Sequence, residues 1–120
     1  MEPRKKTGNQ GEDYATRHLG RRGWDILDRN LRIGGVEIDI LARDGDTHVL
    51  VEVRTRHGAT HGDGAESITP AKAQRLRRAA MAYFQTLGTY CDLRIDVIAV
   101  DLSPPDGPAL QHIENAVTDG

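Results

Sequence analysis

The chain has 120 residues, a length that suits a single domain of ordinary size. Hydrophobic residues make up 38% of it and charged residues 28%, so a core can form, although not a thick one. The net charge of −2 argues against a protein that attracts nucleic acid through overall positive charge. Of the 16 basic residues 13 are arginine, an excess that suits phosphate binding. Because the net charge is not basic, we favour a compositional cause, such as a high-GC genome.

Three features of the sequence bear on its compartment. Cys91 is the only cysteine, so no intrachain disulfide can form. The start of the chain is charged, and no apolar stretch typical of a signal peptide follows it. No apolar run approaches the ~20 residues that a membrane-spanning helix needs. We therefore expect a cytoplasmic protein with no membrane partner, and the sequence permits a homodimer.

The first third of the chain predicts a tail, a helix and a strand. Residues 1–7 form a basic tail that we expect to be disordered. A helix over residues 7–22 follows, with apolar residues at helical spacing and a capping box that begins at Thr7. Residues 24–33 are rich in strand-forming residues but irregular in pattern, and the two glycines at 34–35 predict a turn.

Two alternating strands follow. In residues 36–43, and again in residues 48–56, apolar side chains alternate with charged ones, as in strands that place one face on a core. Asp44-Gly45-Asp46 lies between them and is a strong hairpin signal. The isoleucines of the first strand and the valines of the second should share one core face.

The remainder of the chain predicts a helix and a further strand. A loop over residues 57–68, which we expect to be mobile, leads to a helix over residues 69–87, and Thr69-Pro70 is typical of a helix start. Residues 91–102 form a strand whose second half is apolar on both faces, as in the centre of a sheet. Strand, helix and strand at this spacing predict a βαβ crossover with parallel strands. Residues 109–117 suit a short edge strand or a helix equally.

The hairpin brings acidic residues of two strands onto one face. A turn at residues 44–45 places Asp39 diagonal to Glu52, whereas a turn at residues 45–46 places the two directly opposite. In both registers their carboxylates lie on the same sheet face, within about 5–8 Å. Two further charged residues share that face: Glu37 and Arg54.

The convergence of Asp39 and Glu52 suggests a metal site. Neighbouring carboxylates repel each other unless a cation or water lies between them. Oxygen ligands suit a hard ion such as Mg²⁺, which commonly takes one or two carboxylates together with substrate phosphate. Arg54, two residues beyond Glu52, would lie beside the ion and stabilise charge or position water. Spacing alone also fits solvated residues on the wet face of an antiparallel sheet, which is the more common case. The second helix must cover one face, however, and would leave the acids at the rim of a cleft.

The residues around this pair resemble a known nuclease signature. Glu37-Ile-Asp39 and Glu52-Val-Arg54 are similar to the Asp–(Glu-x-Lys) motif of restriction-endonuclease-like nucleases. More specifically, the chain resembles the YraN-like family of small, uncharacterised bacterial proteins, which is related in fold to archaeal Holliday-junction resolvases. Further matching segments extend the resemblance over about residues 8–117: Gly11-Glu12-Asp-Tyr-Ala15, Arg29-Asn30, Thr69-Pro-Ala-Lys72 and Arg94-Ile-Asp96-Val-Ile.

The resemblance implies a fold and a set of site residues. The fold is α/β, with a restriction-endonuclease-like αβββαβ core whose mixed sheet contains an antiparallel hairpin and a parallel βαβ crossover. It would form one domain over residues 8–120. Asp39 and Glu52 would be ligands of Mg²⁺ or Mn²⁺. Glu12 would be a further acid and metal ligand, delivered from the first helix, and Glu37 would be its neighbour.

The chain departs from the family's pattern at two positions. The family usually has lysine where this chain has Arg54, and glycine where this chain has Val36. Arginine stays charged at every working pH, so Arg54 can stabilise a transition state but cannot readily serve as a base. We therefore expect metal binding, and weak or narrowly targeted cleavage.

Basic residues near the start of the second helix form a candidate phosphate-contacting stripe: Lys72, Arg75 and Arg78. The positive end of the helix dipole would add to their attraction for phosphate. A solvated helix face explains the same residues equally well. In the last main strand, Asp96 is expected to be a structural partner of Arg94 or of a basic residue of the first helix.

These observations lead to three hypotheses about function. The first is a Mg²⁺-dependent endonuclease that acts on structured, branched DNA. The second is a module that binds nucleic acid and a metal ion but cuts poorly, which Arg54 favours. The third is a scaffold protein whose acidic pocket is vestigial.

Overall fold

The computed structural model describes residues 9–57 and 68–117. The predicted tail over residues 1–7, the Thr7 cap and most of the predicted mobile loop lie outside these ranges. No described helix is long and apolar enough to cross a membrane. The elements are α1 (Asn9–Arg21), β1 (Asp25–Ile33), β2 (Val36–Asp44), β3 (Thr47–Arg56), α2 (Pro70–Thr86), β4 (Asp92–Asp101) and β5 (Ala109–Ile113).

The strands form one mixed sheet in the order β1-β2-β3-β4-β5. Neighbouring strands are antiparallel except β3 and β4, which are parallel and are connected through α2. The predicted hairpin and the predicted βαβ crossover are therefore confirmed. Of residues 109–117, which the sequence left open between strand and helix, Ala109–Ile113 form β5, which pairs antiparallel with β4 at the edge of the sheet.

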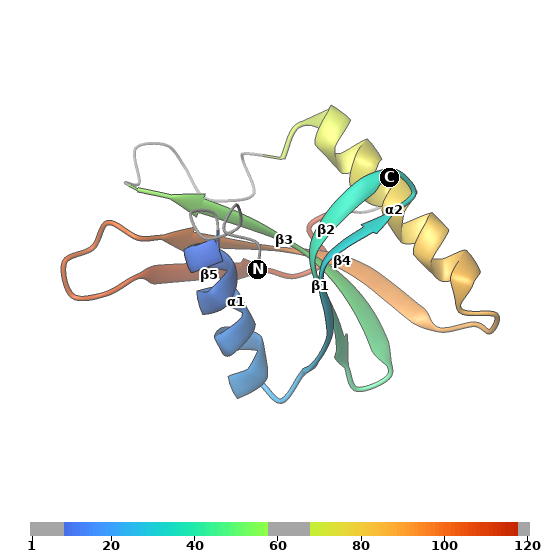
Figure 1. Ribbon diagram of the computed structural model, residues 1–120, viewed down its shortest axis with the longest axis horizontal. Helices are drawn as coiled ribbons and strands as arrows, with labels where there is room; N and C mark the ends of the chain where they lie inside the picture. Colours follow the sequence, from blue (N-terminus) through green and yellow to red (C-terminus); the bar gives the residue numbers. More distant parts are fainter. Residues whose placement is uncertain (1–8, 58–67, 118–120) are drawn as a thin grey trace, which may run out of the picture.

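The two helices cover opposite faces of this sheet (Figure 1). On one face, Ala15 and Leu19 of α1 pack with apolar residues of β2, β3 and β4: Ile40, Ala42, Val49, Val51, Ile98 and Val100. On the other face, residues of α2 pack on Leu41, Leu50 and Ile95: Leu76, Ala79 and Tyr83. The central strands are thus buried on both sides, which explains why their sequences are rich in branched apolar residues.

The expectation that the isoleucines of β2 share one core face with the valines of β3 is wrong for the first half of β2. Val36 and Ile38 pack in the cluster under α2, whereas Ile40 packs in the cluster under α1. The cause is that β2 pairs with β3 only as far as the Ile40–Val51 pair, and before it β2 pairs with β1 alone. This free ribbon curves toward α2, where a β-carbon on Gly34 would lie 3.1 Å from that of Ala82 (Figure 1).

Two local features determine how closely α1 lies on the sheet and where α2 begins. Gly11 of α1 is buried against β3, and a β-carbon there would overlap the hydroxyl of Thr55. At the start of α2, the extended Thr69 caps the helix: its side-chain oxygen accepts a hydrogen bond from the Lys72 N–H at 3.1 Å, and Pro70 follows it. The predicted start of this helix is confirmed, and the cap holds the backbone of Lys72 in place.

Candidate functional site

The site lies where β2 and β3 diverge. Their ladder ends at the Ile40–Val51 pair, and one further step in the same register would place Asp39 opposite Glu52. The turn is therefore at Gly45-Asp46, the second of the two registers that the sequence left open. Beyond the last pair, the Asp39 carboxylate accepts a hydrogen bond from the Val53 N–H at 2.7 Å. The side chain thus replaces the strand pairing that has ended, and both acids face the gap.

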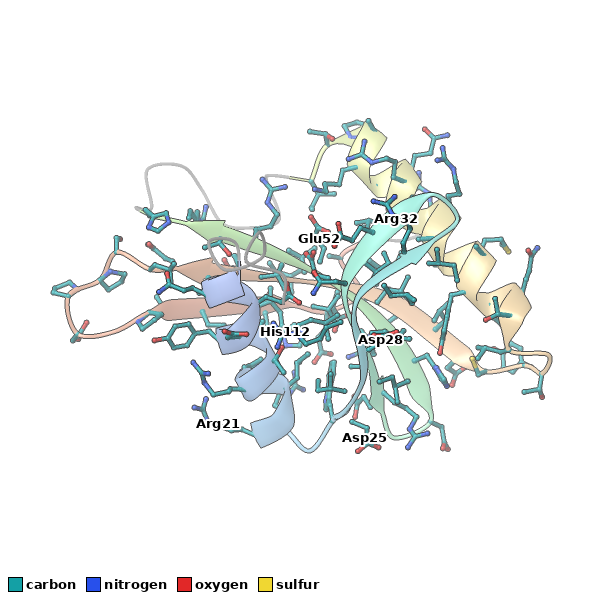
Figure 2. All side chains as sticks on the ribbon, viewed as in Figure 1. Arg21, Asp25, Asp28, Arg32, Glu52 and His112 are labelled. Carbon is teal, nitrogen blue, oxygen red and sulfur yellow. The ribbon has the colours of Figure 1, made fainter. Side chains whose placement is uncertain are left out.

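A cavity of about 230 Å³ opens beside the two acids. Val36 and Leu76 form the apolar part of its wall. The rest of the wall is charged, with three acids and two basic residues: Glu37, Asp39, Glu52, Lys72 and Arg75. The Lys72 ammonium lies 2.7 Å from a Glu52 carboxylate oxygen, and the Glu52 side chain is only 8% exposed. Figure 2 shows Glu52 near the middle of the molecule, between α1 and the start of α2.

The electrostatic balance of this cavity is visible at Asp39. Burial, followed by the negative charge of Glu52, raises the pKa of Asp39 to about 7. Glu12 and Glu37 act in the same direction, while the hydrogen bond from Val53 acts against them. A carboxyl group with such a pKa has too little positive charge around it to hold its own charge firmly near neutral pH.

Glu12 reaches this region from α1 but is held by β1. It is buried, and one of its carboxylate oxygens accepts hydrogen bonds from the Arg29 Nε at 2.9 Å and from the Asn30 amide at 3.0 Å. Asn30 has a left-handed backbone, with a φ of 58°, and lies opposite Asp39 between two regular pairs of the β1–β2 ladder. Apart from their place in the matching segments, no sequence pattern predicts that Arg29 and Asn30 bind the Glu12 carboxylate.

The other predicted site residues fall into two groups. Glu37 and Arg75 line the cavity and are exposed to solvent. Arg54 is half-buried on β3 and Arg78 is exposed on α2, and neither lines the cavity. Lys72, expected only as a phosphate contact, turns out to be the ion-pair partner of Glu52. The Thr69 cap holds the backbone of Lys72 in place. The position of Glu52 next to the Lys72 ammonium depends in addition on the curvature of the sheet.

The donor set fits a small hard cation held by two protein ligands. Asp39 and Glu52 present carboxylate oxygens to one cavity, and Mg²⁺ commonly binds one or two carboxylates with water and phosphate completing its shell. Within residues 9–57 and 68–117, no three His, Cys, Asp or Glu side chains lie close enough together to hold a metal ion. The role of Glu12 as a third direct ligand therefore stays a prediction.

A second polar cluster lies on the α1 face and is structural. Asp96 of β4 is fully buried, and its carboxylate accepts hydrogen bonds from Arg94, from His112 at 2.9 Å and from the Asn115 N–H at 2.9 Å. The Nε2 atom of His18 in α1 lies 3.1 Å from the Nδ1 atom of His112, and Figure 2 shows His112 beside α1. Of the two partners proposed for Asp96, Arg94 is the one it has.

A larger cavity, of about 570 Å³, lies between the second half of α2 and the start of β4. Its walls are mostly apolar and include Met81, Phe84, Leu93 and Val117. None of the predicted acidic site residues lines it, so it is separate from the carboxylate cavity.

Comparison with known proteins identifies the family. The profile of the uncharacterised protein family UPF0102 matches residues 11–100. The chain belongs to this family. The UPF0102 protein of Geobacter sulfurreducens is 44% identical over 110 residues, which cover 91% of this chain and 86% of that relative. The UPF0102 protein of Acidothermus cellulolyticus is 41% identical over 94% of each chain, and that of Herminiimonas arsenicoxydans is 45% identical over 82% of this chain and 79% of its own. The family resemblance found in the sequence is thereby confirmed.

Proposed function

We propose that this UPF0102 protein binds nucleic acid with the help of Mg²⁺ or Mn²⁺, and that it is an endonuclease of the restriction-endonuclease-like fold acting on structured, branched DNA. The supporting observation is the cavity in which Asp39 and Glu52 face Lys72 and Arg75. A phosphodiester is negatively charged and a divalent ion is positively charged, so together they match the basic and the acidic side chains of the cavity wall. The ion suits the carboxylates, and the phosphate oxygens suit the basic residues.

Each residue would have a distinct task in this reaction. Asp39 and Glu52 would hold the divalent ion, which when bound would lower the pKa of a coordinated water and neutralise phosphate charge. Lys72 and Arg75 would orient the phosphate from the α2 side of the cavity. Arg54, which lies on β3 two residues after Glu52 and does not line the cavity itself, would stabilise the charge that develops on the phosphate. It would not serve as a base, because arginine stays protonated at working pH.

Two acids would act from the edge of the site. Glu12, fixed by Arg29 and Asn30, would add negative charge beside Asp39 and so favour cation binding. Glu37, which is exposed on the cavity wall, would lie closest to solvent. The order of elements, α1-β1-β2-β3-α2-β4, is consistent with the αβββαβ core of the proposed nuclease fold.

A second candidate function is a binding or scaffold protein with little or no cleavage. Two features favour it: Arg54 stands where the nuclease motif that the chain resembles has lysine, and the described residues bring no third carboxylate into a metal cluster. Such a protein would keep the charges of the cavity and bind branched DNA without cutting it.

The test compares wild type with Asp39→Asn on branched, single-stranded and duplex DNA in Mg²⁺ or Mn²⁺. Asparagine keeps an acceptor for the Val53 N–H but removes the charge, and Asp46→Asn in the exposed hairpin turn serves as the matched control. We expect the wild type and Asp46→Asn to cut branched DNA, and Asp39→Asn to lose cleavage and calorimetric Mn²⁺ binding. Metal-dependent binding without cleavage supports the second candidate. Cleavage that survives Asp39→Asn contradicts the proposed site.

A further inference from the structure

Lys72 is the residue whose charge lies closest to the acidic pair from the α2 side. Its Nζ is 2.7 Å from the Glu52 carboxylate, and its own side chain is 27% exposed. Its backbone is fixed by the hydrogen bond to the Thr69 side chain in the first turn of α2. That turn contains no acidic residue that could draw the ammonium elsewhere. The contact with Glu52 therefore joins a fixed point on α2 to a nearly buried carboxylate.

A divalent ion at Asp39 and Glu52 would compete with this contact. The ammonium already occupies one oxygen of Glu52, one of the two carboxylates that the cavity offers to a metal ion. Two cations at the same carboxylate repel each other, and this repulsion is stronger near a protein surface than in bulk water. A long, flexible lysine can move away from the ion toward solvent, because its side chain is already partly exposed.

We propose, building on the function above, that Lys72 is a displaceable counter-ion of the carboxylate pair. In the metal-free protein its ammonium neutralises Glu52, and a divalent ion bound by Asp39 and Glu52 releases it to contact a phosphate oxygen of the nucleic acid. Metal binding and phosphate binding are then coupled. The ion must displace Lys72, and the displaced Lys72 raises the affinity of the protein for phosphate. By linkage, phosphate also strengthens metal binding to the same extent.

The first experiment measures two affinities of opposite expected sign. Lys72→Gln removes the competing charge, so Mn²⁺ binding to the protein alone should tighten by roughly tenfold, which corresponds to about 1.4 kcal/mol. In saturating Ca²⁺, binding of a fluorescent single-stranded oligothymidylate of about ten nucleotides should weaken several-fold. Arg77→Gln removes the same charge from α2 but borders the larger apolar cavity, so its Mn²⁺ affinity should equal that of wild type. A structural role of Lys72 would weaken both affinities together, and this result would overturn the proposal.

The second experiment uses the unaltered chain and does not depend on a variant that folds. The sequence contains three lysines, Lys5, Lys6 and Lys72, so acetylation at each can be followed by mass spectrometry. Saturating Mg²⁺ should raise the acetylation rate of Lys72 relative to those of Lys5 and Lys6, because the ammonium leaves Glu52. Unchanged relative labelling, in protein that calorimetry shows to bind the ion, overturns the proposal while leaving the proposed function in place.

The remaining outcomes count against both proposals. If wild type does not bind Mn²⁺ but Lys72→Gln does, Lys72 excludes the ion instead of being displaced by it, and both the displacement of Lys72 and the metal-dependent function of the wild type are wrong. If neither protein binds Mn²⁺ or Mg²⁺, both proposals are wrong.

Discussion

Asn30 shows how the conformation of one residue affects the acidic site. Its φ of 58° lies in the left-handed region, which asparagine tolerates better than other non-glycine residues. From that position its amide reaches Glu12, which in turn raises the pKa of Asp39. Glycine would accept the same backbone but would leave Glu12 without this donor. Such unusual conformations are often retained at functional sites, so the residue belongs to the support of the acidic pair.

Replacement of Gly11 by alanine should weaken the packing of α1 against β3. The new β-carbon would overlap the Thr55 hydroxyl and approach its β-carbon to 3.0 Å, so α1 or β3 must move. We expect a loss of about 1–3 kcal/mol in the free energy of unfolding, measured by urea denaturation. Gly20→Ala is the matched control, because nothing lies within 4 Å of its added β-carbon, and its stability should be unchanged or slightly higher. Equal stabilities of the two variants would contradict the close approach.

The raised pKa of Asp39 predicts a pH dependence of stability in metal-free protein. With a pKa of about 7 instead of 3.8, the folded chain retains a proton that the unfolded chain has released. The contribution of Asp39 to the free energy of unfolding therefore falls as pH rises from about 4 to about 7. In the presence of a chelator, Asp39→Asn should gain stability relative to wild type across this range, as measured by denaturant titration. A constant difference between the two proteins would show that the pKa is not raised.

Arg54 distinguishes an enzyme from a binding module. If the wild type cleaves, Arg54→Ala should lower turnover by roughly two to three orders of magnitude, the usual loss for one preorganised charge donor. Arg54→Lys should keep or raise activity, since it restores the lysine of the nuclease motif that the chain resembles. Single-turnover cleavage of branched DNA measures both. Cleavage that appears only in Arg54→Lys would identify a metal site disabled at one position, whereas full activity of Arg54→Ala would exclude this role.

At the level of the elements, the Asp96 cluster ties α1, β4 and β5 together. Burial alone would raise the pKa of Asp96, but hydrogen bonds from His112, Arg94 and the Asn115 N–H outweigh it and hold the pKa below its ordinary value. The stabilising effect of this charge is thus present above about pH 4 and is lost as pH falls further. Burial, followed by coulombic repulsion from His112, Arg22 and Arg21, lowers the pKa of His18, which disfavours a further positive charge in the cluster.

Asp96→Asn should be among the most damaging single substitutions on the sheet. It leaves His112 without its charged partner, and it leaves Arg94 with only the more distant Asp44 at 3.8 Å and Glu114 at 3.6 Å. Because Asp96 is fully buried, breaking these pairs should cost about 3–5 kcal/mol, the typical loss for a buried ion pair. Thermal denaturation at neutral pH should show this loss, and it should diminish in acid, where wild type also loses the charge. Asp92→Asn, at the exposed start of the same strand, should change stability by less than about 0.5 kcal/mol. Similar melting temperatures for the two variants would contradict the role of the cluster.

The elements themselves were largely predictable, because their signals are local. The alternation of side chains predicted the ends of β2 and β3 within one or two residues, and the Thr69-Pro70 cap predicted the start of α2 equally closely. The irregular pattern of β1 also has a local cause: its register shifts between Ile26 and Asp28, and Asn30 is left-handed. Neither feature follows from strand alternation, so the sequence showed only that the pattern was irregular.

The contacts between elements were less predictable. Both hairpin registers placed Asp39 and Glu52 on one face, so their proximity could be derived, whereas the end of the β2–β3 ladder at Ile40 could not. That divergence decides which face Ile38 covers and lets Lys72 reach Glu52. It depends on the curvature of the whole sheet and on the packing of α2, which no short sequence pattern records.

For the whole molecule, the net charge of −2 makes the placement of positive charge more important than its amount. Arg75 lines the carboxylate cavity, and Arg78 follows it by three residues, so both lie on one side of α2. A sugar–phosphate backbone that enters the cavity would meet Arg78 next along this helix. Lys72 differs from these two arginines, since its ammonium lies 2.7 Å from a Glu52 carboxylate oxygen.

The salt dependence of DNA binding tests this arrangement. Each phosphate contact on duplex DNA contributes about 0.9 to the slope of log K against log salt, through release of counterions. The double variant Arg75→Ala/Arg78→Ala should weaken binding to all sequences about equally and flatten the slope by up to about 1.8, in fluorescence anisotropy titrations. Arg43→Ala, an exposed residue at the far end of the β2–β3 hairpin paired with Asp25, should leave the slope unchanged. Lys72→Ala should flatten it only when a divalent ion is present, because only then is the ammonium free of Glu52. Affinity that does not change between low and physiological salt would mean that these residues form an ordinary solvated helix face.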